Sequence, residues 1–383
     1  MSDWDSGVLS DIAEIVMGQS PAGNACNSSG SGLPLLNGPT EFGVRFPNPV
    51  QFTIDPKKIS LLNDILFCVR GSTTGKMNWA NQKYAIGRGL AAVRHKHGEE
   101  YRYFLKGVID FNLSLLLASA TGSTFPNVSK DQLNDLEIVF PSLPEQKAIA
   151  QVLSSLDDKI DLLHRQNKTL EAIAETLFRQ WFIEEAQDDW EEGTLKDEFD
   201  FTMGQSPSGS SFNEEGTGMP MFQGNADFEF RFPKERVYTT EPKRLANQLD
   251  TLISVRAPVG AQNMAHRECC IGRGVAAFRY KNNRELYTYT YFKMRSLMTE
   301  IKQFNNEGTV FGSISKSDIS GLAVTIPSVD SVLSFENEAK PLNDKVIKNC
   351  QHIQTLKKLR DTLLPKLMSG EVRVAVEPDL EAA

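Results

Sequence analysis

The sequence is poor in cysteine, and its cysteines are not spaced for a metal or redox site. The chain has five cysteines in 383 residues, an odd number. They stand at positions Cys26, Cys68, Cys269, Cys270 and Cys350, with no Cys-X-X-Cys pair. A disulfide framework needs an even set, and a structural zinc site needs closely spaced ligand pairs. We therefore expect reduced, partly buried thiols and no metal.

Long apolar runs are also missing. No stretch reaches the roughly 18 apolar residues that span a bilayer. The first ten residues, MSDWDSGVLS, have neither a basic start nor an apolar signal segment. The sequence therefore predicts a cytoplasmic protein.

Motifs that bind nucleotides are imperfect here. GSTTGKM at Gly71 has one residue too few between its glycines for a P-loop, and Met77 replaces the required Ser or Thr. GRGLAA at Gly87 and GRGVAA at Gly272 match a dinucleotide fingerprint formally. Strand-like basic sequence follows both, whereas a phosphate site needs a helix there. A strand start bounded by glycines is the better interpretation.

Catalytic signatures are equally scarce. The chain has no GxSxG, no HExxH and no Asn-Pro-Pro-aromatic tetrapeptide of the kind used by aminomethylating enzymes. His95 and His97 alternate on one predicted strand without an acidic or cysteine partner set, which favours two exposed histidines over a metal site. We expect no catalytic residue and no cofactor, and interpret the chain as a reader without chemistry of its own.

An overall excess of positive charge is absent, since the net charge is -8. Such a balance argues against nucleic acid, because phosphate binding uses Lys and Arg. Most of the acidity, however, lies in residues 142–190, which carry 5 basic and 10 acidic side chains. The rest of the chain is nearly neutral and can still turn a basic face to a phosphate backbone.

A long internal repeat dominates what is present. MGQSP at Met17 returns at Met203, an offset of 186 residues, and IGRGLAAVR at Ile86 returns as IGRGVAAFR at Ile271. Solenoid repeats are about 20 to 50 residues long, so this period indicates a duplicated domain with its connector. Pseudo-two-fold symmetry is the expected result.

The repeat divides the chain into alternating globules and connectors. Short apolar runs such as DILFCVR and GLAAVR predict strands, and helical spacing over residues 101–120 predicts a helix, so each globule should be α+β. The expected segments are two homologous globules at 1–141 and 190–327, helical spacers at 142–189 and 328–370, and a tail at 371–383.

The connectors predict long helices. Ser142 and Glu145 are spaced as a capping box around Pro144. Apolar residues then step by threes and fours in both connectors, typical of a coiled-coil seam, with Asn167 and Asn349 as polar register residues. We expect the helices to pair antiparallel, each roughly 54 Å long for about 36 residues.

These features together resemble the DNA-specificity subunit of type I restriction-modification systems. The resemblance rests on two GQSP-bearing globules, the helix start FPSLPEQKAIAQVLSSLDDKI and the closing LRDTLLPKLMSGEVRV, and covers the whole chain. It implies target recognition domains that bind double-stranded DNA. It also implies two modification (methyltransferase) subunits and restriction subunits as partners, which hold the adenine-methylation and ATP-driven cleavage activities. The second helix start, IPSVDSVLSFENEA, lacks the Pro-Glu-Gln of the first.

Two different globules on a spacer predict a bipartite, asymmetric DNA target with an unread gap. Residues common to both globules are candidates for shared contacts with DNA, and base readers should lie where the copies diverge, as in residues 24–37 against 210–223. The candidates are Gln19, Ser20, Arg45, Arg70, Arg88, Ser123 and Lys130 in the first globule, and Gln205, Ser206, Arg231, Arg256, Arg273, Thr309 and Lys316 in the second.

Each candidate set has a structural alternative. The GQSP segments can be plain turns, the Gly-Ser and Gly-Thr loops can be helix ends, and each arginine can pair with a carboxylate. For the whole chain, the alternative function is a coiled-coil scaffold or DNA-mimic regulator that uses the acidic helix. An enzyme in its own right would need catalytic carboxylates or a cofactor loop, neither of which the sequence offers.

Overall fold

The computed structural model describes residues 4–120, 126–281, 283–304 and 312–375. The chain forms two compact units. Unit 1 comprises residues 1–162 together with 354–383, and unit 2 comprises residues 163–353. Each unit therefore holds one globule and a part of both long helices.

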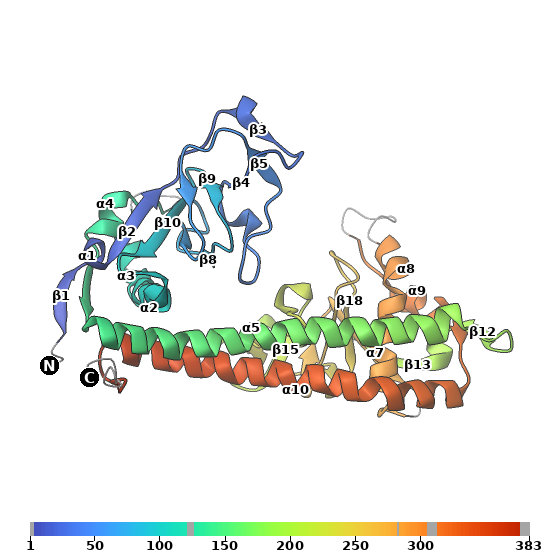
Figure 1. The fold of residues 1–383 in the computed structure, drawn as a ribbon. Coiled ribbons are helices and arrows are strands. Elements are labelled where there is room, and N and C mark those ends of the chain that lie inside the picture. The colour runs from blue at the N-terminus through green and yellow to red at the C-terminus, as the bar shows by residue number, and fades with distance from the viewer. Residues whose placement is uncertain (1–3, 121–125, 282, 305–311, 376–383) are drawn as a thin grey trace, which may run out of the picture. The chain divides into compact units, whose positions relative to one another are not determined.

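The globule of unit 1 mixes short strands with short helices, as the apolar runs predicted (Figure 1). Buried positions dominate β7 and β10, which correspond to the DILFCVR and GLAAVR runs. Its elements are β1 (Asp5–Val8), α1 (Leu9–Ile12), β2 (Ala13–Met17), β3 (Cys26–Asn27), β4 (Leu33–Leu36), β5 (Gln51–Thr53), β6 (Ile59–Ser60), β7 (Ile65–Cys68), β8 (Met77–Trp79), β9 (Tyr84–Ile86), β10 (Leu90–His95), α2 (Arg102–Phe111), α3 (Leu113–Ala118), α4 (Lys130–Asn134) and β11 (Glu137–Phe140).

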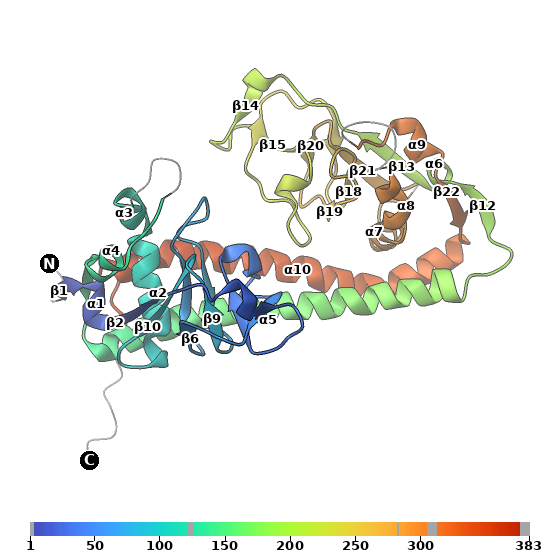
Figure 2. The same cartoon turned by 90° about the horizontal axis from the view of Figure 1, so that it is seen from above.

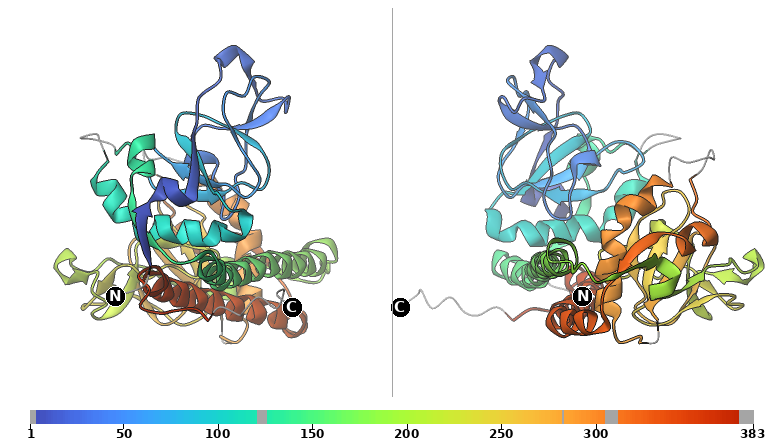
Figure 3. Two further views of the ribbon diagram at one scale, coloured as in Figure 1. Left: turned by 60° about the vertical axis from the view of Figure 1, so that its left-hand side comes forward. Right: turned by 90° about the vertical axis from the view of Figure 1, so that its right-hand side faces the viewer.

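Three sheets organise this globule. A four-stranded antiparallel sheet has the order β2-β10-β7-β8, and a five-stranded sheet has the order β3-β5-β4-β9-β6 with β4 and β9 parallel. The first and last strands of the globule, β1 and β11, form a separate two-stranded antiparallel sheet. Helix α2 packs between the four-stranded sheet and the long helices (Figure 3). The approach is close at Gly107, where an added Cβ would lie 3.2 Å from Leu153 and 3.3 Å from Leu364 of the long helices.

Unit 2 repeats this plan element by element (Figure 2). Its four-stranded sheet has the order β13-β21-β18-β19 and its five-stranded sheet the order β14-β16-β15-β20-β17. Its elements are β12 (Glu191–Thr194), α6 (Leu195–Glu198), β13 (Phe199–Met203), β14 (Phe212–Asn213), β15 (Met219–Phe222), β16 (Tyr238–Thr239), β17 (Leu245–Ala246), β18 (Thr251–Ser254), β19 (Gln262–Met264), β20 (Cys269–Ile271), β21 (Val275–Tyr280), α7 (Tyr287–Ser296), α8 (Met298–Gln303), α9 (Lys316–Ser320) and β22 (Ala323–Ile326).

The two connectors are the long helices α5 (Leu143–Arg179), which ends in a π-helical turn over Gln180–Glu184, and α10 (Val329–Met368). They pair antiparallel within each unit. In unit 1, Asp157 of α5 bonds Arg360 of α10 at 2.9 Å. In unit 2, the rings of Phe178 and Phe335 pack 5.5 Å apart.

A buried amide pair lies on the seam of unit 2. Asn167 and Asn349 are 0% and 2% exposed, and Asn349 Nδ2 donates to Asn167 Oδ1 at 2.9 Å. Asn167 Nδ2 donates in turn to the Cys350 sulfur at 3.3 Å. A buried polar pair of this kind is satisfied in one register only, so it matches the register role expected for both residues.

At the start of α5, Glu145 and Gln146 of the Pro-Glu-Gln segment hold other parts of unit 1. The Gln146 side chain bonds the buried His95 ring at 3.0 Å and donates to the Pro141 carbonyl at 2.8 Å. Both Glu145 oxygens accept from Arg373, at 2.5 and 2.7 Å. In the second copy Tyr280 stands at the position that corresponds to His95, and Ser331 and Val332 stand at the positions that correspond to Glu145 and Gln146.

His95 is not the exposed histidine that the sequence suggested. Its side chain is 5% exposed and stacks on Tyr101 at 4.8 Å between ring centres, whereas His97 lies at the surface. Burial lowers the pKa of His95 to about 4. The residue is therefore neutral at pH 7 and joins the globule to the start of α5.

Candidate nucleic-acid interface

Four of the sequence candidates in each unit converge on one edge of the four-stranded sheet. In unit 1, β2 and β7 end at this edge while β10 and β8 begin there, because neighbouring antiparallel strands run in opposite directions. The segments that follow or precede these ends carry the predicted glutamine, serine and two arginines of each unit, together with two polar residues that were not predicted individually. We call this surface the loop edge: Gln19, Ser20, Asn37, Arg70, Arg88 and Asn127 in unit 1, and Gln205, Ser206, Gln223, Arg256, Arg273 and Ser313 in unit 2.

The GQSP turn is packed directly on the GRG turn. Gly18 N–H donates to the Leu90 carbonyl at 2.8 Å and Gln19 N–H to the Ile86 carbonyl at 2.9 Å. A Cβ on Gly18 would stand 2.1 Å from the Gly87 carbonyl, so no side chain fits there. The glycine of GQSP is thus structural, and it sets the position of the Gln and Ser that follow.

Hydrogen bonds also connect the GRG turn with the GQSP turn and with the end of β7. Arg88 N–H donates to Ser20 Oγ at 3.3 Å, and Val69 N–H donates to the Gly89 carbonyl at 2.9 Å. Beyond Val69, Arg70 Nε donates to Asn127 Oδ1 at 3.2 Å. Turns far apart in the sequence therefore lie side by side.

Unit 2 reproduces these contacts. Gln205 N–H donates to the Ile271 carbonyl at 2.9 Å, and Arg273 N–H donates to Ser206 Oγ at 3.2 Å. A Cβ on Gly204 would again lie 2.1 Å from the carbonyl of Gly272. Arg256 forms a β-bridge with Ser313, as Arg70 does with Asn127. The repeated residues of the sequence thus mark a repeated surface.

This surface is polar and open. The side chains of the loop-edge glutamines and arginines are exposed in both units, namely Gln19, Arg70, Arg88, Gln205, Arg256 and Arg273. Amides and guanidinium groups bind base edges and phosphates respectively. The arrangement can therefore present two kinds of nucleic-acid contact on one sheet edge.

The remaining candidates fall into two groups. Lys130 and Lys316 are exposed first residues of the short helices α4 and α9, which Ser129 and Ser315 cap. Ser123 and Thr309 lie outside the described residues. The lysines follow Asn127 and Ser313 closely in the chain, so they stay in the candidate interface.

Arg45 and Arg231 have a different role, because both are held by carboxylates of α5. Arg45 bonds Tyr103 at 2.7 Å and pairs with Asp158 at 2.6 Å and Asp161 at 3.4 Å. This is the carboxylate alternative considered from the sequence. We leave Arg45 out of the candidate interface.

The second arginine is buried outright. Arg231 is 1% exposed, pairs with Glu171 at 3.1 Å and lies over the Tyr291 ring at 3.8 Å. Glu171 also accepts from Arg295 at 2.6 Å. A guanidinium enclosed in this way has no surface to offer to DNA, so Arg231 too is left out of the interface.

Comparing the two copies within the sequence identified residues 24–37 and 210–223 as divergent segments. It did not single out Asn37 and Gln223 within them. A Cβ on Gly87 would lie 2.3 Å from Asn37 Oδ1 and 3.2 Å from Ser20 Oγ, so the three residues meet at one point. The equivalent distances from Gly272 are 3.1 Å to Gln223 Cγ and 3.3 Å to Ser206 Oγ. The two glycines of GRG were the available signal, since they are required where another chain segment approaches closely.

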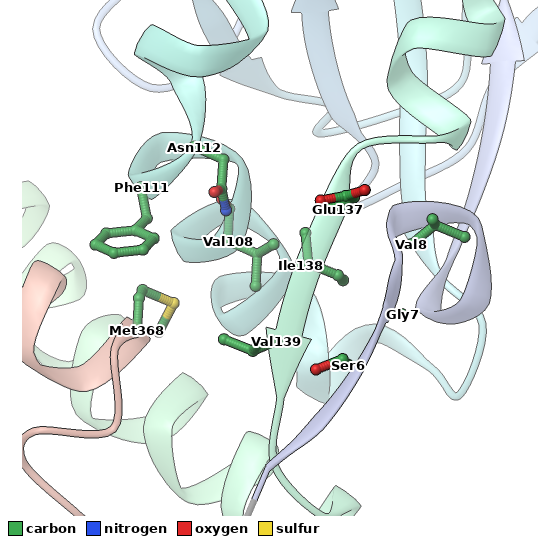
Figure 4. A pocket seen from close by; sticks show the side chains of 10 residues that line it. All are labelled: Ser6, Gly7, Val8, Val108, Phe111, Asn112, Glu137, Ile138, Val139 and Met368. Atoms are coloured by element: carbon green, nitrogen blue, oxygen red, sulfur yellow. The ribbon is translucent and has the colours of Figure 1, made fainter. Parts of the chain in front are cut away.

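A separate pocket lies in unit 1 and shares no residue with the loop edge (Figure 4). Its volume is about 640 Å³, and its lining combines apolar side chains, such as Val108, Phe111 and Met368, with the polar side chains of Ser6 and Asn112. Glu137 is its one ionisable side chain. Among the described residues, none that was predicted to bind DNA lines this pocket.

Across the described ranges, we find no helix that is both long and apolar enough to cross a bilayer.

Comparison with known proteins places the chain in a family. Residues 1–172 and 187–332 both match the family model described as the type I restriction modification DNA specificity domain. A Methanocaldococcus jannaschii protein named for the MjaX type I restriction enzyme specificity subunit is 31% identical over 65% of this chain and 62% of its own length. The MjaIX specificity subunit of the same organism is 27% identical over 97% of this chain and 94% of its own.

A solved structure shares the fold. The type I restriction-modification S subunit from M. genitalium matches with a TM-score of 0.63 and 20% identity, covering 96% of each chain. The expected fold class, two homologous α+β domains with two long helices, is confirmed. With its repeated domain matches and its full-length relatives, the chain belongs to the type I restriction-modification DNA specificity family.

Proposed function

We propose that this chain is the non-catalytic DNA-recognition subunit of a type I restriction-modification complex, and that each globule reads one half of a split, asymmetric duplex target. The observation that carries the proposal is the loop edge, which recurs in both units with the same arginines, glutamines and serines in the same hydrogen-bonded frame. Two equivalent surfaces with different neighbouring side chains suit two different half-sites.

Within each half-site, the shared residues provide the contacts that do not depend on sequence. Arg70 and Arg88 extend from adjacent turns, as Arg256 and Arg273 do in unit 2, and guanidinium groups bind phosphate oxygens in two-pronged fashion. Each such contact releases counterions, so binding should weaken steeply with added salt. Lys130 and Lys316 would extend the same backbone contact.

Adenine methylation and ATP-driven cleavage would reside in the partners, two modification subunits and the restriction subunits. The long helices are the proposed docking surface, because they keep large apolar side chains exposed, such as Ile173 at 45% and Leu359 at 45%. Acidity is a weaker argument for docking. Several carboxylates of α5 already bind arginines of the same chain, as Asp157 binds Arg360 and Glu171 binds Arg231.

The helices would also act as the ruler between the half-sites. Lengthening α5 by seven residues after Leu163, with a matching insertion in α10 to keep the seam paired, should widen the unread gap. The gap is measured in the methylated motif. An unchanged gap would mean that the helices do not set it.

The decisive experiment compares methylated motifs in DNA from cells that carry this chain with its partner methyltransferase and from cells that lack the chain. We expect a new split, asymmetric motif with methylated adenine in its half-sites. Replacing residues 1–141 by another member's first globule should change one half-site only. No new motif despite an active, assembled methyltransferase would defeat the proposal.

The scaffold or DNA-mimic alternative makes the opposite prediction, namely partner binding without duplex binding. A DNA mimic needs a row of unpaired carboxylates. In α5, Asp158 and Asp161 bind Arg45, while Glu171 binds two further arginines. The chain thus uses much of its acidic helix to hold its own globules, which favours the recognition role.

A further inference from the structure

Most of the loop edge is identical in the two units, and identical side chains cannot distinguish different half-sites. The Gln, Ser and both arginine positions are the same. Two positions differ: Asn37 corresponds to Gln223, and Asn127 corresponds to Ser313. Asn127 already accepts a hydrogen bond from Arg70 at 3.2 Å and so helps to place the arginine. Position 37/223 is the one to consider as a reader.

The backbone at this position is fixed by the shared frame. Gly87 N–H donates to the Leu36 carbonyl at 2.8 Å, and a Cβ on Gly89 would lie 2.2 Å from the Asn37 carbonyl. In unit 2, Gly272 N–H donates to the Phe222 carbonyl at 2.8 Å, and a Cβ on Gly274 would lie 2.1 Å from the Gln223 carbonyl. The backbone at this position is therefore held in the same way in both units, whereas the side chain differs.

The two side chains are exposed but held differently. Asn37 Nδ2 donates to Gln51 Oε1 at 3.1 Å, which leaves its second N–H and its oxygen for a ligand. In unit 2, Val237 takes the place of Gln51. Gln51 pairs with Leu35 of β4, the strand that precedes Asn37, and Val237 accepts a hydrogen bond from Met221 of β15, the strand that ends directly before Gln223. Gln223 is thus one methylene longer and lacks that amide neighbour.

We propose that Asn37 and Gln223 are specificity-determining residues, each making a bidentate contact with the major-groove edge of an adenine in its own half-site. An amide is the side chain whose paired acceptor and donor match adenine N6–H and N7. The different length and different neighbour would direct the two amides to different positions within their half-sites. This inference rests on the proposed DNA-recognition function.

The test uses the assembled complex of this chain with its partner methyltransferase. Asn37→Asp and Gln223→Glu keep shape but remove the donor that adenine N7 needs. Each should lower affinity for a duplex carrying the wild-type motif by about 5- to 150-fold. Each should also relax or change one base in one half-site only, with Asn37→Asp affecting the half-site read by unit 1.

Controls separate reading from folding and from charge. Gln82→Glu and Gln248→Glu add the same charge at exposed amides that lie toward the opposite end of each sheet, and they should leave the motif unchanged. Asn37→Gln and Gln223→Asn place at each position a side chain that the equivalent frame already accommodates. These exchanges should also alter one half-site each.

The outcomes are distinguishable. If the wild-type complex methylates a split motif and all four changes at 37 and 223 leave it intact within twofold, the reader assignment is wrong while the proposed function stands. The divergent loops after Arg70 and Arg256 would then carry the reading. If the wild-type complex produces no motif, the proposed function itself fails.

Discussion

Glu171 provides a sharp test of how the second globule is held on α5. Its Oε1 accepts from Arg231 at 3.1 Å and from Arg295 at 2.6 Å, and Arg231 is 1% exposed. Glu171→Gln preserves the shape but leaves two guanidinium groups without their shared carboxylate. Breaking a buried ion pair from one side costs about 3–5 kcal/mol, because the remaining charge stays buried and uncompensated. We expect a loss of that size in unit 2.

Hydrogen exchange followed by mass spectrometry measures this loss locally. Amides of α7 and of the segment around Arg231 should exchange faster by a factor that corresponds to about 3–5 kcal/mol, with unit 1 peptides unaffected. A change below about 1 kcal/mol in these peptides would contradict the reasoning, since exposed pairs contribute that much. Unchanged exchange would show that Arg231 is held by packing on Tyr291.

Asp158→Asn in unit 1 is the matched control. The Asp158 side chain is 55% exposed, and Arg45 keeps Asp161 as a second partner at 3.4 Å. Solvent screens such a pair, so the expected loss is at most about 1 kcal/mol. Equal losses for Asp158→Asn and Glu171→Gln would show that burial does not set the difference.

Three further predictions concern the other polar contacts. Asn167→Leu should cost about 1–3 kcal/mol in urea unfolding because it strands the buried Asn349 amide, and adding Asn349→Leu should recover most of the loss; a larger loss in the double variant would contradict this. Arg373→Ala should speed hydrogen exchange of residues 371–375, which depend on the bidentate contact with Glu145, while an unchanged rate would mean that packing alone holds them. Burial lowers the pKa of His95 from 6.5 to about 4, so the unfolded chain binds the proton more readily than the folded chain does. The contribution of this group to the free energy of unfolding is present above pH 6.5 and is lost as the pH falls toward 4. The expected loss is on the order of 3 kcal/mol. The slope of unfolding free energy against pH in that window should flatten in His95→Gln, and an identical slope would refute the assignment.

Much of the architecture was predictable because the duplicated domains carry the same sequence pattern twice. Repeated strings marked the loop edge, and steps of three and four marked the long helices. The repeat could not separate ligand contacts from packing contacts. Arg45 and Arg231 recur as faithfully as Arg88 and Arg273, yet the first two pair with carboxylates of α5 while the others are exposed.

The missing information lay in contacts between residues far apart in sequence. His95 appeared exposed because an alternating strand pattern gives no sign of Gln146, which covers its ring from the start of α5. The partner of Glu145 was equally hidden, since Arg373 stands 228 positions away. Such pairings follow from tertiary packing and leave no local periodicity.

The division of the chain between the two units has a consequence for its synthesis. The core of unit 1 includes residues from the C-terminal part of α10, which are synthesised only after residues 163–353. At about 5–20 residues per second, a ribosome takes roughly 10 to 40 seconds to translate that stretch. During this interval the first part of α5 has emerged without the segment of α10 that covers it, and Leu363 and Leu364 are not yet available to pack against the first core. The core of the first globule is therefore completed only after the second globule has been translated.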